Sequence, residues 1–160
     1  MKVIDNFLPS YQFKILERMM RSTEFPWYYN DGILKTHEPH QYQFTHLFYY
    51  KGDKNFSSEF LPLLDSGINK LGLTRLWRIK ANLNPRTLFH RKAGYHIDFE
   101  DIMTAVYYVN TTNGWTEFKK GGRVKSVANR VVIFDSNLEH SGVTCTDEKR
   151  RMVINFNYEV

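Results

Sequence analysis

Residues 151–158 read Arg-Met-Val-Ile-Asn-Phe-Asn-Tyr, an alternation typical of a β-strand with two different faces. Successive side chains of a strand point to opposite sides of the sheet. One face is uniformly apolar and should pack on a core: Met152, Ile154, Phe156 and Tyr158. The other face is polar at intervals, as a cavity wall would be: Arg151, Val153, Asn155 and Asn157. We therefore expect β-structure with an internal pocket beside this strand.

Further strands are expected upstream, between turns rich in Gly, Pro and Asn. They cover residues 43–50, 76–83, 95–98, 102–109, 115–118 and 130–134. Apolar residues at helical spacing predict helices over residues 10–22, with Ser10 as a possible cap, and 58–71, ended by Gly72. Two helices ahead of many short strands favour an α+β, mainly β fold, a two-sheet antiparallel jelly roll.

Composition sets broad limits on the class of protein. A chain of 160 residues with 42% apolar residues suits one domain with a real core, residues 1–160. The one cysteine, Cys145, excludes an internal disulfide, and no apolar stretch has the length of a signal or a membrane span. We expect a cytoplasmic protein without membrane contact. The net charge of +5 can attract acidic substrates or nucleic acid, although ordinary solvated surface charge is the simpler interpretation.

Three residues have the chemistry of a metal site. His96 and Asp98 are two apart on an expected strand and can aim at a common point. His140, delivered by the loop after residues 130–134, would complete two nitrogens and one oxygen on one side of a metal, as in non-haem Fe(II) oxygenases. Each residue alone has a simpler interpretation: a satisfied histidine, a turn-forming aspartate and a polar loop residue. Only the set, taken with Arg151, favours a metal site.

The remaining histidines lack such company in the sequence. They are His37, His40, His46 and His90. We expect His37 and His40 to be surface residues of a polar loop.

Arg151 and Tyr108 are the candidates for holding a cosubstrate. A buried arginine needs a partner, and a dicarboxylate would satisfy its guanidinium bidentately. An internal ion pair with Asp or Glu is the alternative for Arg151, and Arg150 would face the other way. Tyr108 shares a strand face with Thr104 and Val106 and could donate to the same carboxylate, or simply be a core aromatic.

The order His-x-Asp, distal His, then an Arg opening a strand resembles the Fe(II)/2-oxoglutarate-dependent oxygenases, and within them the prolyl 4-hydroxylase-like branch. Residues 94–98, 104–110 and 130–156 carry the resemblance, within a motif-bearing core of residues 75–159. Residues 25–29 are similar, more weakly, to small phage-encoded members, which would place the protein in a host cytoplasm.

The resemblance implies a double-stranded β-helix with supporting N-terminal helices. It implies Fe(II) held by His96, Asp98 and His140, and 2-oxoglutarate held by Arg151 and Tyr108. The implied reaction consumes O2 and 2-oxoglutarate, releases succinate and CO2, and hydroxylates a C–H bond, with a prolyl residue of a peptide or protein as the first candidate. The carboxylate at Asp98 favours hydroxylation over halogenation. A need for ascorbate and the oligomeric state stay open.

Two alternatives to a peptide hydroxylase remain. A nucleic-acid oxidative demethylase shares the same metal chemistry, and the basic, aromatic-rich composition would suit it. A non-catalytic jelly-roll binding module would share the fold. Residues 31–41 and 89–93 are the expected gate loops of the pocket.

Overall fold

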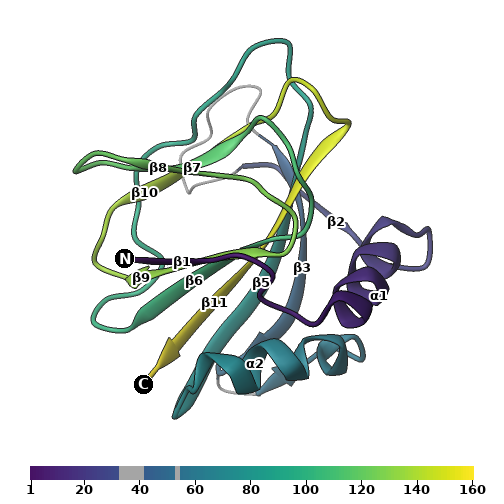
Figure 1. Cartoon of the computed structure of the whole chain (residues 1–160), viewed down its shortest axis with the longest axis vertical. Coiled ribbons are helices and arrows are strands. Elements are labelled where there is room, and N and C mark those ends of the chain that lie inside the picture. Colours follow the sequence, from purple (N-terminus) through teal and green to yellow (C-terminus); the bar gives the residue numbers. More distant parts are fainter. Residues whose placement is uncertain (33–41, 53–54) are drawn as a thin grey trace.

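The computed structural model describes residues 1–32, 42–52 and 55–160, most of which form two antiparallel β-sheets. Figure 1 shows two helices against one side of the larger sheet and the smaller sheet on the other side. In order, the larger sheet holds β1 (Lys2–Ile4), β9 (Arg130–Asp135), β6 (Met103–Tyr108), β11 (Arg150–Glu159), β5 (Arg75–Pro85), β3 (Gln43–Tyr50) and β2 (Tyr28–Asn30), with β4 (Phe56–Ser57) paired to β3. The smaller sheet holds β10 (His140–Val143), β7 (Trp115–Phe118) and β8 (Arg123–Lys125). The mainly β, two-sheet fold predicted from the sequence is confirmed.

The alternating segment 151–158 belongs to β11, which lies at the centre of the larger sheet. β11 pairs with β6 on one side and β5 on the other, so it has no free edge over most of its length. Its apolar face is buried in the helix-side core, as predicted: Met152, Ile154, Phe156 and Tyr158. Its other face looks toward the smaller sheet, where Val153 joins a second core with Val106 and Phe118. The alternation therefore separates a dry layer from a layer that can hold polar groups.

The helices differ from expectation in detail. α1 covers Ser10–Arg21, but Pro9 occupies the cap position and no side chain caps the helix, so the prediction for Ser10 is wrong. Ser10 is already the first helical residue. The second predicted helix starts late, because residues Leu61–Leu64 form a 3₁₀ turn (η1) and the α-helix α2 covers only Asp65–Leu71. Gly72 ends it in the left-handed region at φ 62°, as predicted.

The expected strand over residues 95–98 is also wrong. His96 makes one isolated bridge, to His140, and the chain then bends at residues 98–102. Asp101 lies within this bend and has a positive φ of 57°. The strands β1, β4, β8 and β10 were not predicted, and each spans only two to four residues. Such short strands depend on tertiary pairing and carry little periodicity of their own.

Among the described residues, no helix is long and apolar enough to cross a membrane.

Candidate metal and cosubstrate site

A cavity of about 670 Å³ opens between the two sheets and continues along the exposed face of β5. Four of the site residues predicted from the sequence line it: His96, Asp98, His140 and Arg151. They come from three separate parts of the chain, so the fold brings them to one space. Tyr108 lies directly behind the lining, with its hydroxyl 2.8 Å from the hydroxyl of Thr116, which does line the cavity.

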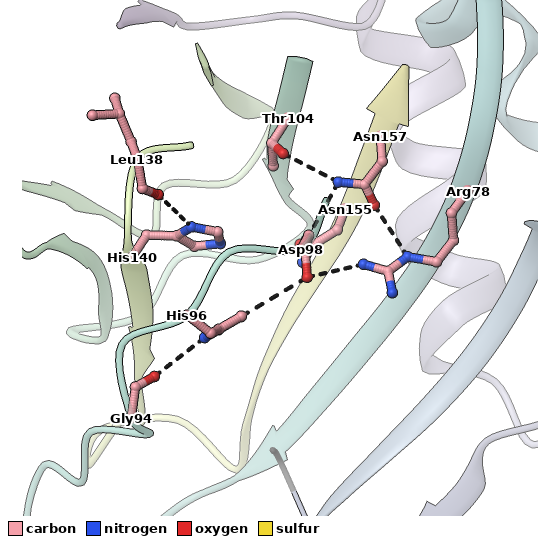
Figure 2. A network of polar contacts seen from close by, with 9 residues as sticks. All are labelled: Arg78, Gly94, His96, Asp98, Thr104, Leu138, His140, Asn155 and Asn157. Carbon is pink, nitrogen blue, oxygen red and sulfur yellow. Dashed lines mark hydrogen bonds and ion pairs between the residues drawn. The ribbon is translucent and has the colours of Figure 1, made fainter. Parts of the chain in front are cut away.

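The two histidines are held to each other through their backbones. His96 N–H donates to the His140 carbonyl at 3.1 Å, and His140 N–H donates to the His96 carbonyl at 3.0 Å. Their rings face each other with centroids 4.8 Å apart. Each Nδ1 also points at a nearby carbonyl, that of Gly94 for His96 and that of Leu138 for His140 (Figure 2). Because a carbonyl only accepts, the neutral form of each ring carries its proton on Nδ1, which leaves a lone pair on Nε2.

Asp98 is already engaged in the structure. Its Oδ1 lies 2.9 Å from Nη2 of Arg78 and 3.9 Å from Nε2 of His96. Its Oδ2 accepts longer contacts from the amides of Asn155 and Asn157, at 3.5 and 3.4 Å. In Figure 2 the carboxylate sits between His96 and Arg78. Arg78 comes from β5 and was not foreseen from the sequence.

The protonation states suit cation binding. Burial alone would raise the pKa of Asp98, but the positive charge of Arg78, together with His140 and His96, holds that pKa below its ordinary value. Burial lowers the pKa of His140, more than the nearby carboxylate of Asp98 raises it. At neutral pH the pair is therefore one carboxylate and one neutral imidazole, the forms that coordinate a metal.

The donor set fits Fe(II) in its chemistry, while its arrangement is not yet that of a closed site. Two imidazole nitrogens and a carboxylate line the same cavity, and these donor types make up the ligand set of a non-haem iron centre. Across residues 1–32, 42–52 and 55–160, however, no three His, Cys, Asp or Glu side chains are arranged to hold an ion as they stand. In this arrangement one oxygen of Asp98 is directed toward the Arg78 guanidinium. A cation bound here would share this carboxylate with Arg78 or displace it.

At the other end of the cavity, Arg151 is buried to 2% exposure. Its Nε donates to the Ser126 hydroxyl at 2.7 Å and its Nη2 donates to the Thr116 hydroxyl at 3.1 Å. Within the described part of the chain it has no carboxylate within ion-pair distance, so the alternative of an internal ion pair is not formed. Burial lowers the pKa of Arg151 from its very high ordinary value, which expresses the cost of this isolated charge.

Tyr108 packs directly against this guanidinium. The Arg151 carbon Cζ lies 5.6 Å from the centre of the Tyr108 ring, within the range of a cation–π contact. Burial raises the pKa of Tyr108, although Arg151 and Thr116 oppose the shift. The tyrosine therefore stays protonated, and its hydroxyl can donate a hydrogen bond to an acceptor beside Arg151. The present acceptor is Thr116 Oγ1.

Two glycines make room for Arg151. A Cβ on Gly114 would lie 2.9 Å from Arg151 Cδ and 2.7 Å from the Val143 carbonyl, closer than side chains tolerate. A Cβ on Gly142 would approach Arg151 Nη1 to 3.4 Å. At Gly114, therefore, the chain comes this close to the arginine only because the position has no side chain, while at Gly142 the fit is merely close.

The remaining predictions fall in different places. The gate segment 31–41 lies mostly outside the described residues, as do His37 and His40, although Asp31 and Gly32 line the cavity. In the gate segment 89–93, Arg91 and Lys92 line the cavity. His46 is a buried structural residue, bonded to the Pro26 carbonyl and the Ser58 hydroxyl. His90 contacts the Thr144 carbonyl through Nδ1 and is not among the residues that line the cavity.

Sequence comparison gives no relatives: no family model matches the chain. No curated protein matches it either.

Solved structures, in contrast, match almost the whole chain. A prolyl hydroxylase of Trichoplax adhaerens, in complex with a peptide fragment of the hypoxia inducible factor oxygen degradation domain, has a TM-score of 0.67 at 14% identity, covering 99% of this chain and 83% of its own. A Pseudomonas putida prolyl-4-hydroxylase has a TM-score of 0.67 at 17% identity, with 99% and 92% covered. An oxidoreductase of the 2-oxoglutarate–Fe(II) oxygenase family from Burkholderia pseudomallei has a TM-score of 0.71 at 10% identity, with 98% and 84% covered.

At sequence identities this low, structural similarity establishes only the fold, and the chemistry has to be argued from the residues of this chain. The chain has the jelly-roll fold of the prolyl hydroxylases and other 2-oxoglutarate–Fe(II) oxygenases.

Proposed function

We propose that this chain is an Fe(II)- and 2-oxoglutarate-dependent dioxygenase that hydroxylates a prolyl residue of a peptide or protein. The observation that carries the proposal is the buried guanidinium of Arg151, which has no carboxylate partner in the described chain. It lies in the same cavity as His96, Asp98 and His140. A dicarboxylate that reaches from the metal ligands to Arg151 would supply the missing negative charge.

Each residue then has a defined task. His96, Asp98 and His140 would hold Fe(II), which when bound supplies the redox chemistry that couples loss of CO2 from 2-oxoglutarate to hydroxylation. Arg151 and Tyr108 bind and orient the distal carboxylate of 2-oxoglutarate by an ion pair and an O–H donor. The two carbonyls facing the Nδ1 atoms keep both imidazoles in the tautomer that coordinates through Nε2. Overall, one oxygen atom of O2 enters succinate and the other enters the new hydroxyl group.

A peptide substrate is supported by the form of the cavity. The lining extends along β5 beyond the proposed metal ligands. Neither the metal nor the cosubstrate would contact these further residues. One of the similar structures is a prolyl hydroxylase in complex with a peptide fragment. A nucleic-acid substrate usually stacks its bases on aromatic rings. In the described lining Tyr42 is the sole Phe, Tyr or Trp.

The test is spectroscopic and does not need the substrate. Purified protein is mixed under anaerobic conditions with Fe(II) and then 2-oxoglutarate, and the weak visible charge-transfer band of the bidentate complex is recorded. We expect the band in the native chain and its loss in His96→Ala. Full iron affinity in Asp98→Ala or His140→Ala would refute the metal assignment.

Succinate release in air then separates an enzyme from a binding module. Conversion of 2-oxoglutarate to succinate, even without substrate, is expected of the enzyme. A protein that binds both Fe(II) and 2-oxoglutarate and never releases succinate would be a binding module. Parallel assays with peptides and methylated oligonucleotides distinguish the hydroxylase from a demethylase.

A further inference from the structure

Lys80 is a half-buried cation of the cavity that the proposed reaction does not use. It lies on β5 and lines the cavity, with no hydrogen bond or ion pair within the described part of the chain. The carboxylate of Asp98 is near enough to act on it electrostatically but is paired with Arg78. A sheltered ammonium group without a partner is costly, so its presence in a ligand cavity calls for an explanation.

Lys80 belongs to a continuous polar face of β5. Since every second residue of a strand faces the same way, four consecutive positions of this face line the cavity: Arg78, Lys80, Asn82 and Asn84. Lys80 pairs across the sheet with Asn155 of β11, which also lines the cavity. The side-chain oxygen of Asn155 is buried and has no hydrogen-bond donor in the described structure. An unpaired donor and an unpaired acceptor thus lie on neighbouring strands of one wall.

The charge of the cavity points the same way. Its described lining holds six cationic side chains, Arg78, Lys80, Arg86, Arg91, Lys92 and Arg151, and two carboxylates, Asp31 and Asp98. Arg78 pairs with Asp98 and Lys92 pairs with Glu117 outside the lining. Binding of 2-oxoglutarate and Fe(II) together adds no net charge, so the positive excess around Lys80 persists in the loaded site. That excess favours an anionic second ligand.

We propose that Lys80 is a specificity-determining residue that binds an acidic side chain, Asp or Glu, of the peptide substrate. This inference rests on the proposed function for the identity of the substrate as a peptide. A peptide offers both groups that the wall lacks: a carboxylate to accept from the Lys80 ammonium and backbone N–H groups to donate to Asn155. The carboxamides of Asn82 and Asn84 continue the row outward and can bond further peptide groups. Leu88 and Phe89, 91% and 79% exposed, lie in the adjoining loop and can contact apolar flanks of the same peptide.

The experiment measures binding rather than turnover. The protein, held anaerobically with Fe(II) and 2-oxoglutarate, is offered two pools of short peptides with a central proline. One pool has Asp and Glu among its randomised flanks, and in the other every Asp and Glu is replaced by Asn or Gln. Retained peptides are identified by mass spectrometry. We expect acidic peptides to be retained about tenfold better than their amide counterparts, since a charge-assisted hydrogen bond is at stake.

Variants at Lys80 test whether this residue causes the preference for acidic peptides. Lys80→Met should abolish it, Lys80→Arg should keep most of it, and Lys80→Glu should favour peptides that carry Lys or Arg. Lys120→Met removes an exposed lysine outside the cavity lining and serves as the matched control. A Lys80→Met variant that retains the acidic preference would overturn the proposal.

Other outcomes are equally decisive. Equal retention of the two pools by the native chain refutes the inference, and retention of single-stranded oligonucleotides in preference to both pools replaces the peptide with a nucleic acid. A parallel loss of 2-oxoglutarate affinity in Lys80→Met would assign Lys80 to the cosubstrate and overturn its role in substrate choice. If the protein releases no succinate but still retains acidic peptides preferentially, the proposed function is refuted, while the peptide-binding role of Lys80 is supported.

Discussion

The two ends of the cavity are built in different ways. At the metal end, defined by His96, Asp98 and His140, the residues lie on a bent segment and on the first residue of a short strand. At the cosubstrate end, defined by Arg151, Tyr108 and Thr116, all three residues lie within regular strands. The metal end already satisfies its carboxylate with Arg78, whereas the cosubstrate end keeps a cation without a counter-charge.

This difference indicates how the two ligands would be accommodated. If Arg151 and Tyr108 bind 2-oxoglutarate as proposed, their donors are already fixed by packing, and binding would need little rearrangement. At the metal end, the Arg78 guanidinium is paired with the carboxylate of Asp98. A metal bound as proposed would displace Arg78 or share this carboxylate with it. We expect substitutions at the cosubstrate end to act on affinity directly, and those at the metal end to act through competition.

The largest effect is expected at Arg151. Its replacement by Met removes the charge that would bind the distal carboxylate, and 2-oxoglutarate affinity should fall about a hundredfold, as when one partner of a buried ion pair is lost. Isothermal titration with 2-oxoglutarate in the presence of Fe(II) measures this change. Arg150→Met is the matched control, because the neighbouring side chain does not line the cavity. Equal losses in the two variants would show that the cosubstrate is not bound by Arg151.

Competition at the metal end is tested by Arg78→Met. Without the guanidinium, Asp98 loses its present partner and a like charge leaves the neighbourhood of the cation, so affinity for Fe(II) should rise about tenfold. An anaerobic Fe(II) titration gives the affinity. Weaker binding would instead mean that Arg78 positions Asp98 for the metal, and the contrast between the two ends would disappear.

Tyr108→Phe should have a moderate effect at the cosubstrate end. The ring and its contact with Arg151 remain, while one O–H donor is lost, so 2-oxoglutarate affinity should fall about fivefold. Iron affinity measured without 2-oxoglutarate should not change, because Tyr108 is not among the metal donors. A change in iron affinity equal to the loss in 2-oxoglutarate affinity would contradict the separation of the two ends.

The smallest effect concerns the segment that carries His96. Lys92 and Tyr95 both bond Glu117 on β7, and these hydrogen bonds, with that of Trp115, lower the pKa of Glu117 to about 2. A lowered pKa contributes stability above the ordinary value of 4.5, and this contribution is lost as the pH falls toward 2. Glu117→Gln should therefore lower the melting temperature slightly at neutral pH and have no effect near pH 2. Thermal denaturation at both pH values provides the measurement, and an equal shift at both would argue against the ionised contact.

Periodicity and residue chemistry were enough to predict part of the fold and of the site. The alternation of β11 predicted that Arg151 and Val153 face a cavity, and both residues line it in the structure. The residues His96, Asp98 and His140 could be grouped because each type is a metal ligand, and their roles stay predictions. None of this required knowledge of which strands pair.

The features that could not be predicted depend on strand order and register. Arg78 and Lys80 read as ordinary charges on a strand, and only the pairing of β5 beside β11 places them next to Asp98 and Asn155. A strand is expected over residues 95–98, whereas the structure gives that segment a single bridge, between His96 and His140. Local patterns do not encode such non-local contacts.

That single bridge has a mechanical consequence. The peptide groups of positions 96 and 140 are joined by a reciprocal pair of hydrogen bonds, so the two imidazoles project from directly paired backbone positions. If an ion sits between them, this bridge keeps the two backbones at a fixed separation, and only side-chain rotation is needed for the rings to reach the ion. The spacing of the two imidazoles would then outlast the loss of the ion, so that an emptied site could bind a new ion without rebuilding its backbone.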